Sequence, residues 1–134
     1  MIDKKTLSVD ASYSSKTGIM EYRGLWTDTG VVYFHEIFSV GTNNLGEFLA
    51  IVQGIAQMKK DGINKDIYTD SNTAMAWVRN KKVNTNLVYN KDTSYLWDVI
   101  NRAESWLKSN NYDNSLIKWK TKEWGEIVAD FDRK

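Results

Sequence analysis

Over its first forty residues the chain reads as a series of extended segments. Residues 6–11 (TLSVDA) place apolar side chains on one side, which predicts a strand that ends at Asp10. Residues 19–26 and 31–40 are rich in β-branched and aromatic side chains, and the link 27–30 contains the Asp and Gly that hairpin turns favour. We therefore expect three strands in an antiparallel meander.

Beyond this meander the apolar positions change to helical spacing. Residues 44–60 carry apolar side chains three and four positions apart, and this pattern predicts the strongest helix of the chain. The remaining elements expected, in chain order, are a short buried strand over 66–70, a helix from Ser71 or Asn72 to about Asn80, a polar stretch to about Asn90, a helix over 93–109, a strand over 116–120 and a helical segment from about Glu126 onward. This order predicts one α/β domain over residues 1–134, with a five-stranded mixed sheet and helices on both faces.

Composition limits the classes of function. The 134 residues are 42% hydrophobic, enough for one core, and no run of about eighteen apolar residues could cross a bilayer. Cysteine is absent, which excludes disulfides, thiolate zinc sites and a cysteine nucleophile, so any metal must be held by oxygen. We expect a soluble, cytoplasmic monomer without a membrane partner.

The charge pattern limits how the chain could bind a polyanion. Its 18 basic and 17 acidic side chains give a net charge of +1, which argues against a nonspecific DNA-coating protein and leaves only local binding. Short basic clusters occur at Lys59 and Lys60, at Arg79, Lys81 and Lys82, at Lys118, Lys120 and Lys122, and at Arg133 and Lys134. Taken alone, each is typical of a solvated surface.

Acidic residues stand at positions where strands and helices meet. Asp10 and Asp70 each end a predicted strand, and ligands of open α/β sheets tend to bind at the carboxyl ends of strands. Glu47 lies beside the apolar stripe of the predicted helix 44–60, where it can reach a sheet edge. With 17 acids in the chain, any one of these is typical of a surface carboxylate. Only their combination indicates a site.

Four segments carry a resemblance to a known family: LSVDAS (7–12), GTNNLGEFLAIVQG (41–54), YTDSNTAMAWV (68–78) and WKTKEWGEIVADFDRK (119–134). In order and spacing they resemble the catalytic domain of bacterial type 1 ribonuclease H over nearly the whole chain. The resemblance implies a ribonuclease H-like fold and cleavage of the RNA strand of RNA/DNA hybrids without base-sequence selectivity. It also implies four catalytic metal ligands, namely Asp10, Glu47, Asp70 and Asp130.

The chemistry of that reaction explains a need for several carboxylates. A phosphodiester is anionic, so it repels an attacking hydroxide, and charge builds on the departing sugar oxygen. Two divalent cations roughly 4 Å apart can activate the water and stabilise the leaving oxygen. Mg²⁺ suits such oxygen ligands, with Mn²⁺ as a possible substitute. The resemblance implies products with 3′-hydroxyl and 5′-phosphate ends.

The resemblance further implies how a hybrid would be bound, since only the 2′-hydroxyl separates RNA from DNA. Candidate residues for the RNA strand are Ser12, Ser15, Asn43 and Asn72. Candidate residues for the DNA strand are Thr42, Asn44, Trp77, Thr85, Asn86 and Thr121. A tryptophan at helical spacing is also typical of a core, so both interpretations of Trp77 stay open.

The sequence contains two further residues with side chains that are common in catalysis, Glu126 and His35. Many relatives carry a histidine in the loop before the last aspartate, and here Glu126 stands in its place, for which we expect an auxiliary catalytic role. The single histidine, His35, lies in a predicted strand, and we exclude it from catalysis.

Two alternatives remain open. The chain could be the ribonuclease H domain of a reverse transcriptase or polyprotein, or a nonenzymatic hybrid-binding domain of the same fold. Retention of all four acids argues against the latter. No long basic insertion follows residue 81, so we expect either modest affinity for the hybrid or help from a further domain or partner.

Overall fold

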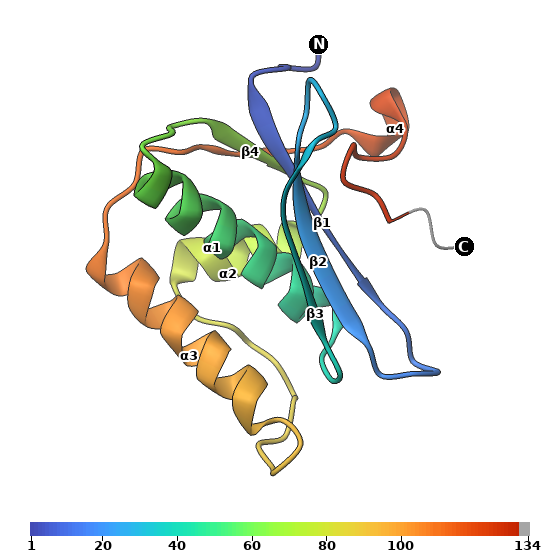
Figure 1. The fold of residues 1–134 in the computed structure, drawn as a ribbon, viewed down its shortest axis with the longest axis vertical. Coiled ribbons are helices and arrows are strands. Elements are labelled where there is room, and N and C mark those ends of the chain that lie inside the picture. Colours follow the sequence, from blue (N-terminus) through green and yellow to red (C-terminus); the bar gives the residue numbers. More distant parts are fainter. Residues whose placement is uncertain (132–134) are drawn as a thin grey trace.

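A computed structural model describes residues 1–131 (Figure 1). Its elements are β1 (Thr6–Tyr13), β2 (Met20–Trp26), β3 (Val32–Phe38), α1 (Asn43–Asp61), β4 (Asp66–Thr69), α2 (Asn72–Asn80), α3 (Ser94–Ser109), β5 (Leu116–Lys118) and α4 (Thr121–Trp124). The strands form a single sheet in the order β3-β2-β1-β4-β5. Strands β1, β2 and β3 are antiparallel, whereas β4 is parallel to both β1 and β5. The predicted mixed sheet with an antiparallel meander is confirmed.

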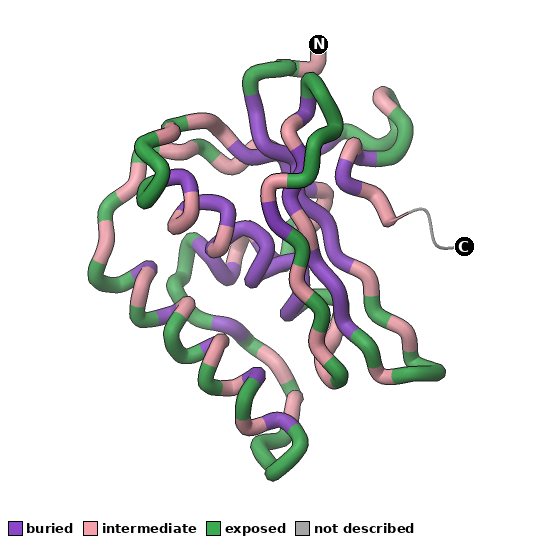
Figure 2. Tube along the Cα trace, in the orientation of Figure 1, coloured by how far each residue is buried: buried purple, intermediate pink, exposed green. Residues whose placement is uncertain are grey.

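The helices α1, α2 and α3 lie on one side of the sheet (Figure 1). Helix α1 packs on β1 and β2, and α2 and α3 pack in turn on α1. The close approach of α1 to β1 depends on Gly54, because a Cβ at this position would lie 3.0 Å from Cδ2 of Leu7. The centre of the sheet and the facing side of α1 are buried (Figure 2). Burial of this apolar surface is the main force that holds α1 at a fixed position over β1.

The opposite face of the sheet carries a smaller aromatic cluster. Tyr68 of β4 and Trp119 contact edge to face at 5.1 Å between ring centroids, and Trp124 of α4 lies 5.7 Å from Tyr68. The indole Nε1 of Trp119 donates a 2.8 Å hydrogen bond to the carbonyl oxygen of Gly125. The single-turn helix α4 and the segment after it therefore cover this face, so helices occur on both faces as expected.

The end of the chain differs from the sequence prediction. A helix from Glu126 onward was expected, but α4 spans Thr121–Trp124 and residues 126–131 are irregular. Gly125, at φ 76° and ψ −162°, ends the helix in a conformation that few other residues adopt. Ile127 and Ala129 are then buried in a non-helical segment. The basic pair Arg133 and Lys134, which closes the family-like motif, lies outside the described residues.

The other differences between the predicted and the observed elements are small. The last strand ends at Lys118 instead of residue 120, and β1 continues to Tyr13. Among residues 1–131, no helix has the length and apolar character needed to span a bilayer.

Candidate metal centre

Three carboxylates from separate elements meet at one edge of the fold. Asp10 lies in β1, Glu47 in α1 and Asp70 directly after β4. Each offers a carboxylate oxygen, and these oxygens all lie within 4.8 Å of one another. Asp10 and Glu47 are only 7% and 2% exposed, so this is not an ordinary surface cluster.

The parallel pairing of β1 and β4 brings the two aspartates together. Ser8 is the partner of Tyr68 in this ladder, so Asp10 and Asp70 each lie two residues beyond a paired position. The strands run in the same direction, and their carboxyl ends therefore meet at the same edge of the sheet. Lys118, at the end of β5, donates a hydrogen bond from Nζ to the carbonyl oxygen of Asp70.

The start of α1 brings Glu47 to the same point. The helix begins after Thr42, whose side chain caps it by accepting a 3.1 Å hydrogen bond from the backbone N–H of Leu45. Gly46 then permits contact with β1, because a Cβ there would lie 2.8 Å from Cβ of Ala11. As a result, Oε1 of Glu47 accepts a 2.6 Å hydrogen bond from the N–H of Ala11.

Burial and mutual repulsion keep these acids from ionising easily. Burial is the largest cause that raises the pKa of Glu47 well above its ordinary value, with contributions from its hydrogen bond to Asp10 and from the charges of Asp10 and Asp70. Burial also raises the pKa of Asp10 to about 6, and the charges of Asp70 and Asp130 add to this rise. The pKa of Asp70 is raised by burial as well, although the positive charge of Lys118 opposes the shift. Without a cation, therefore, the cluster is electrostatically unfavourable when ionised.

One oxygen of the cluster has no hydrogen-bond donor among the described residues. Oε2 of Glu47 is buried and accepts no hydrogen bond from any residue between 1 and 131. A buried carboxylate oxygen without a donor costs about 1 to 3 kcal/mol, or more when charged. A cation between the three carboxylates would satisfy this oxygen and offset the repulsion. The all-oxygen donor set fits a hard divalent ion such as Mg²⁺.

The fourth expected ligand, Asp130, lies near the end of the described chain. Its charge contributes to the raised pKa of Asp10, which places it in the field of the cluster, although it does not belong to the close group of three. Its backbone is held by β2, because Arg23 donates from Nη2 to the Asp130 carbonyl oxygen at 2.7 Å. Glu126 is exposed, and its negative charge contributes to the raised pKa of Asp70.

Five of the six residues expected at the DNA strand line one hollow. Its lining residues are Thr42, Asn44, Trp77, Asn84, Thr85, Asn86 and Leu87, around a volume of about 380 Å³. Asn84 and Leu87 were not predicted, although their position beside Thr85 and Asn86 could have indicated them. Trp77 belongs both to the core and to the hollow, since it is 8% exposed and contacts Phe48 edge to face at 6.2 Å.

The fold is similar to that of a solved ribonuclease structure. LC11-RNase H1, isolated from compost by a metagenomic approach, superposes with a TM-score of 0.55 at 12% sequence identity, over 88% of this chain and 85% of that chain. The chain has the ribonuclease H fold. The N-terminal RNase H domain of Rv2228c from Mycobacterium tuberculosis, solved as a fusion with maltose-binding protein, matches at 18% identity and a TM-score of 0.42, over 84% and 82% of the two chains. No protein-family model matches the sequence.

Within this ribonuclease H fold the remaining candidate residues are dispersed. Asn43 and Asn72 are the exposed first residues of α1 and α2, and they lie four residues before Glu47 and two residues after Asp70. Ser12 and Ser15 line a second hollow at the turn between β1 and β2. Thr121 begins α4 on the opposite face of the sheet and does not line the hollow that contains Trp77.

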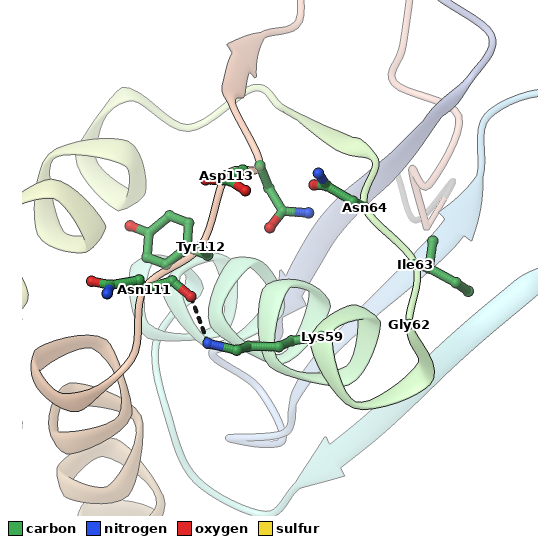
Figure 3. Close-up of a pocket in the computed structure, with 8 residues that line it drawn as sticks. Lys59, Gly62, Ile63, Asn64, Asn111, Tyr112 and Asp113 are labelled. Atoms are coloured by element: carbon green, nitrogen blue, oxygen red, sulfur yellow. Dashed lines mark hydrogen bonds between the residues drawn. The ribbon is translucent and has the colours of Figure 1, made fainter.

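A further hollow lies at the other end of α1 from Glu47 (Figure 3). Nζ of Lys59, in the last turn of α1, donates a 2.6 Å hydrogen bond across it to the carbonyl oxygen of Asn111. Asp113 is the single carboxylate in its lining. This hollow offers no acidic cluster, and the bond of Lys59 links α1 to the loop before β5.

Proposed function

We propose that the protein is a divalent-metal-dependent endonuclease that cuts the RNA strand of RNA/DNA hybrids. The observation that carries this proposal is the convergence of Asp10, Glu47 and Asp70 at one edge of a ribonuclease H fold, with a buried oxygen that lacks a donor. Residues so placed suit phosphodiester hydrolysis better than a purely structural role, because ionised together they lower the stability of the empty protein.

Asp10, Glu47 and Asp70 would bind Mg²⁺, or Mn²⁺ in its place, and Asp130 would complete a site for a second ion. When bound, two such ions activate a water and stabilise the leaving oxygen of a phosphodiester. The chain's own part is to hold the carboxylates apart from bulk water and in fixed positions. The bond from Ala11 to Glu47 fixes one of them, and it leaves the second oxygen of Glu47 available for a cation.

The hollow between α1 and α2 suits a DNA backbone. Its polar groups include the neutral side chains of Asn44, Thr85 and Asn86, which can fix a phosphate without reading bases. The exposed edge of Trp77 in the same hollow would lie against a deoxyribose, where a 2′-hydroxyl would not fit. Asn43 and Asn72 would contact 2′-hydroxyls of the RNA strand beside the cut. Cleavage would leave 3′-hydroxyl and 5′-phosphate ends.

A labelled 18-base-pair hybrid, incubated with the protein and Mg²⁺, tests this function. Wild-type protein is expected to shorten the RNA strand at several positions, to leave the DNA strand and duplex DNA intact, and to stop when EDTA is added. Asp70→Asn should lower the rate at least about a hundredfold, since it removes a charged ligand without changing size. Asp98→Asn is the matched control, because Asp98 is an exposed residue of α3 paired with Arg102. Equal rates for wild type and Asp70→Asn would contradict the assignment.

A further inference from the structure

A row of three polar residues crosses the antiparallel part of the sheet on the face away from α1. Arg23 of β2 is paired with Asp10 of β1 on one side and with His35 of β3 on the other. Paired residues of adjacent strands project from the same face. Arg23 therefore stands between a carboxylate of the acidic cluster and the exposed edge of the sheet.

Arg23 binds residues 129–131, the last described segment of the chain. Its Nε donates to the carbonyl oxygen of Ala129 at 2.9 Å, and its Nη2 donates to that of Asp130 at 2.7 Å. The guanidinium carbon also lies 4.4 Å from the ring centroid of Phe131, a cation–π contact. Three successive residues are thus held by one planar group. A lysine could not make all of these contacts, because its ammonium is a compact point charge, whereas the guanidinium is a planar group with several donors.

The held segment has little regular structure of its own. Residues 126–131 form neither helix nor strand, and the N–H of Asp130 bonds locally to the carbonyl oxygen of Ile127 at 2.9 Å. Phe131 also lies beside His35, whose ring centroid is 5.8 Å from that of Phe131 and whose Nε2 lies 2.8 Å from Oε2 of Glu21. Ile127 and Ala129 attach the segment to the sheet, and Arg23 links the backbone of Asp130 to β2, the strand beside Asp10.

We propose that Arg23 is a positioning residue that fixes the backbone of residues 129–131 and thereby holds the Asp130 carboxylate at the acidic cluster. This inference rests on the proposed function only for its catalytic consequence. The placement of Asp130 and the binding of a cation can be measured without any hydrolysis. In this proposal Arg23 acts through the backbone of residues 129–131, where it donates to the carbonyl oxygens of Ala129 and Asp130.

The test compares Arg23→Ala and Arg23→Lys in the full chain, with Arg102→Ala as the control arginine on the exposed surface of α3. In metal-free protein, hydrogen exchange of the Asp130 amide should be about tenfold faster in Arg23→Ala, while the amides of β1 keep their protection. Calorimetric titration with Mg²⁺ alone should show affinity lowered by about 10- to 100-fold, as for other residues that orient metal ligands. Arg23→Lys should give a smaller loss in both measurements, and Arg102→Ala none.

With the hybrid as substrate, Arg23→Ala should lower kcat by about 10- to 100-fold and change KM less than about threefold. Raising the Mg²⁺ concentration should recover part of the loss. Unchanged amide exchange and unchanged Mg²⁺ affinity in a folded Arg23→Ala protein would overturn the inference, as would loss of protection throughout β1, which would mean general unfolding. If wild type cuts no hybrid, the proposed function fails, yet the exchange and titration experiments still decide the role of Arg23.

Discussion

The N–H of Ala11 donates a 2.6 Å hydrogen bond to Oε1 of Glu47, which joins residues 36 positions apart at the contact of β1 with α1. This bond uses one oxygen of the glutamate and leaves Oε2 buried without a donor among the described residues. A substitution that keeps Oε1 and removes the charge therefore separates the structural role of Glu47 from its role toward a cation.

Glu47→Gln should make the metal-free protein more stable and strongly lower hybrid cleavage. The amide oxygen can still accept from Ala11, while the repulsion among the carboxylates falls. Urea unfolding in EDTA at pH 8 should show a gain on the order of 1 to 3 kcal/mol. Hybrid cleavage in Mg²⁺ should fall at least about a hundredfold. Glu123→Gln, at an exposed position of α4, is the control and should change neither quantity. A less stable Glu47→Gln protein would contradict this explanation of the pKa shifts.

The stability of the metal-free protein should fall as pH rises above about 4. In the unfolded chain Asp10 and Glu47 ionise near pH 4, whereas in the folded protein the pKa of Asp10 is about 6 and that of Glu47 is raised further. The folded state thus holds more protons over this range, so unfolding becomes easier as pH increases. Thermal unfolding in EDTA from pH 4 to pH 8 measures this slope.

Adding Mg²⁺ should reverse that trend. Metal binding requires ionised carboxylates and releases protons, so its stabilising effect should be larger at pH 8 than at pH 5. The same thermal series with Mg²⁺ in excess checks this. An unfolding temperature that rises with pH in EDTA, or a Mg²⁺ effect independent of pH, would be inconsistent with a buried cluster that binds the ion.

Gly46→Ala should disturb the site by displacing its neighbour Glu47. The new Cβ would lie 2.8 Å from Cβ of Ala11, so α1 must move away from β1 and carry Glu47 with it. We expect a loss of about 1 to 3 kcal/mol in unfolding free energy together with reduced cleavage. The double variant Gly46→Ala with Ala11→Gly removes the clash and should recover much of both. Failure of the second change to recover activity would show that the clash is not the cause.

Asn86→Ala should weaken substrate binding with little effect on chemistry. Asn86 lines the hollow assigned to the DNA backbone, distant in sequence from the carboxylates. Loss of a phosphate contact should raise KM for the hybrid several-fold and leave kcat nearly unchanged. Asn101→Ala, at an exposed position of α3, should leave both constants unchanged. A fall in kcat without a change in KM would instead indicate a role near the cleaved bond.

Much of this site follows from local patterns. Alternation of apolar residues located the first strand around Asp10, although β1 continues to Tyr13, and a short buried run located β4 just before Asp70. Helical spacing located Glu47 on α1. The resemblance to the family indicated side chains that line the hollow, including Thr85 and Asn86. The positions of these strands and of α1 could be predicted because strand direction and helix face are encoded within a few residues.

The structure of the C-terminal segment could not be predicted from local sequence patterns. The acids and apolar residues after Trp124 resemble a helix, but Gly125 ends it and burial of Ile127 and Ala129 decides the later path. The role of Arg23 was equally hidden, because its acceptor at Ala129 lies 106 positions away and is a backbone carbonyl, which no side-chain pattern reveals.

Crystals soaked in Mn²⁺ and measured at the manganese absorption edge provide the most direct test of the central claim. The account predicts anomalous density between the carboxylates of Asp10, Glu47 and Asp70, within about 2.0 to 2.4 Å of an oxygen of each. Clear density for Mn²⁺ elsewhere on the protein, with none between these three side chains, would contradict it.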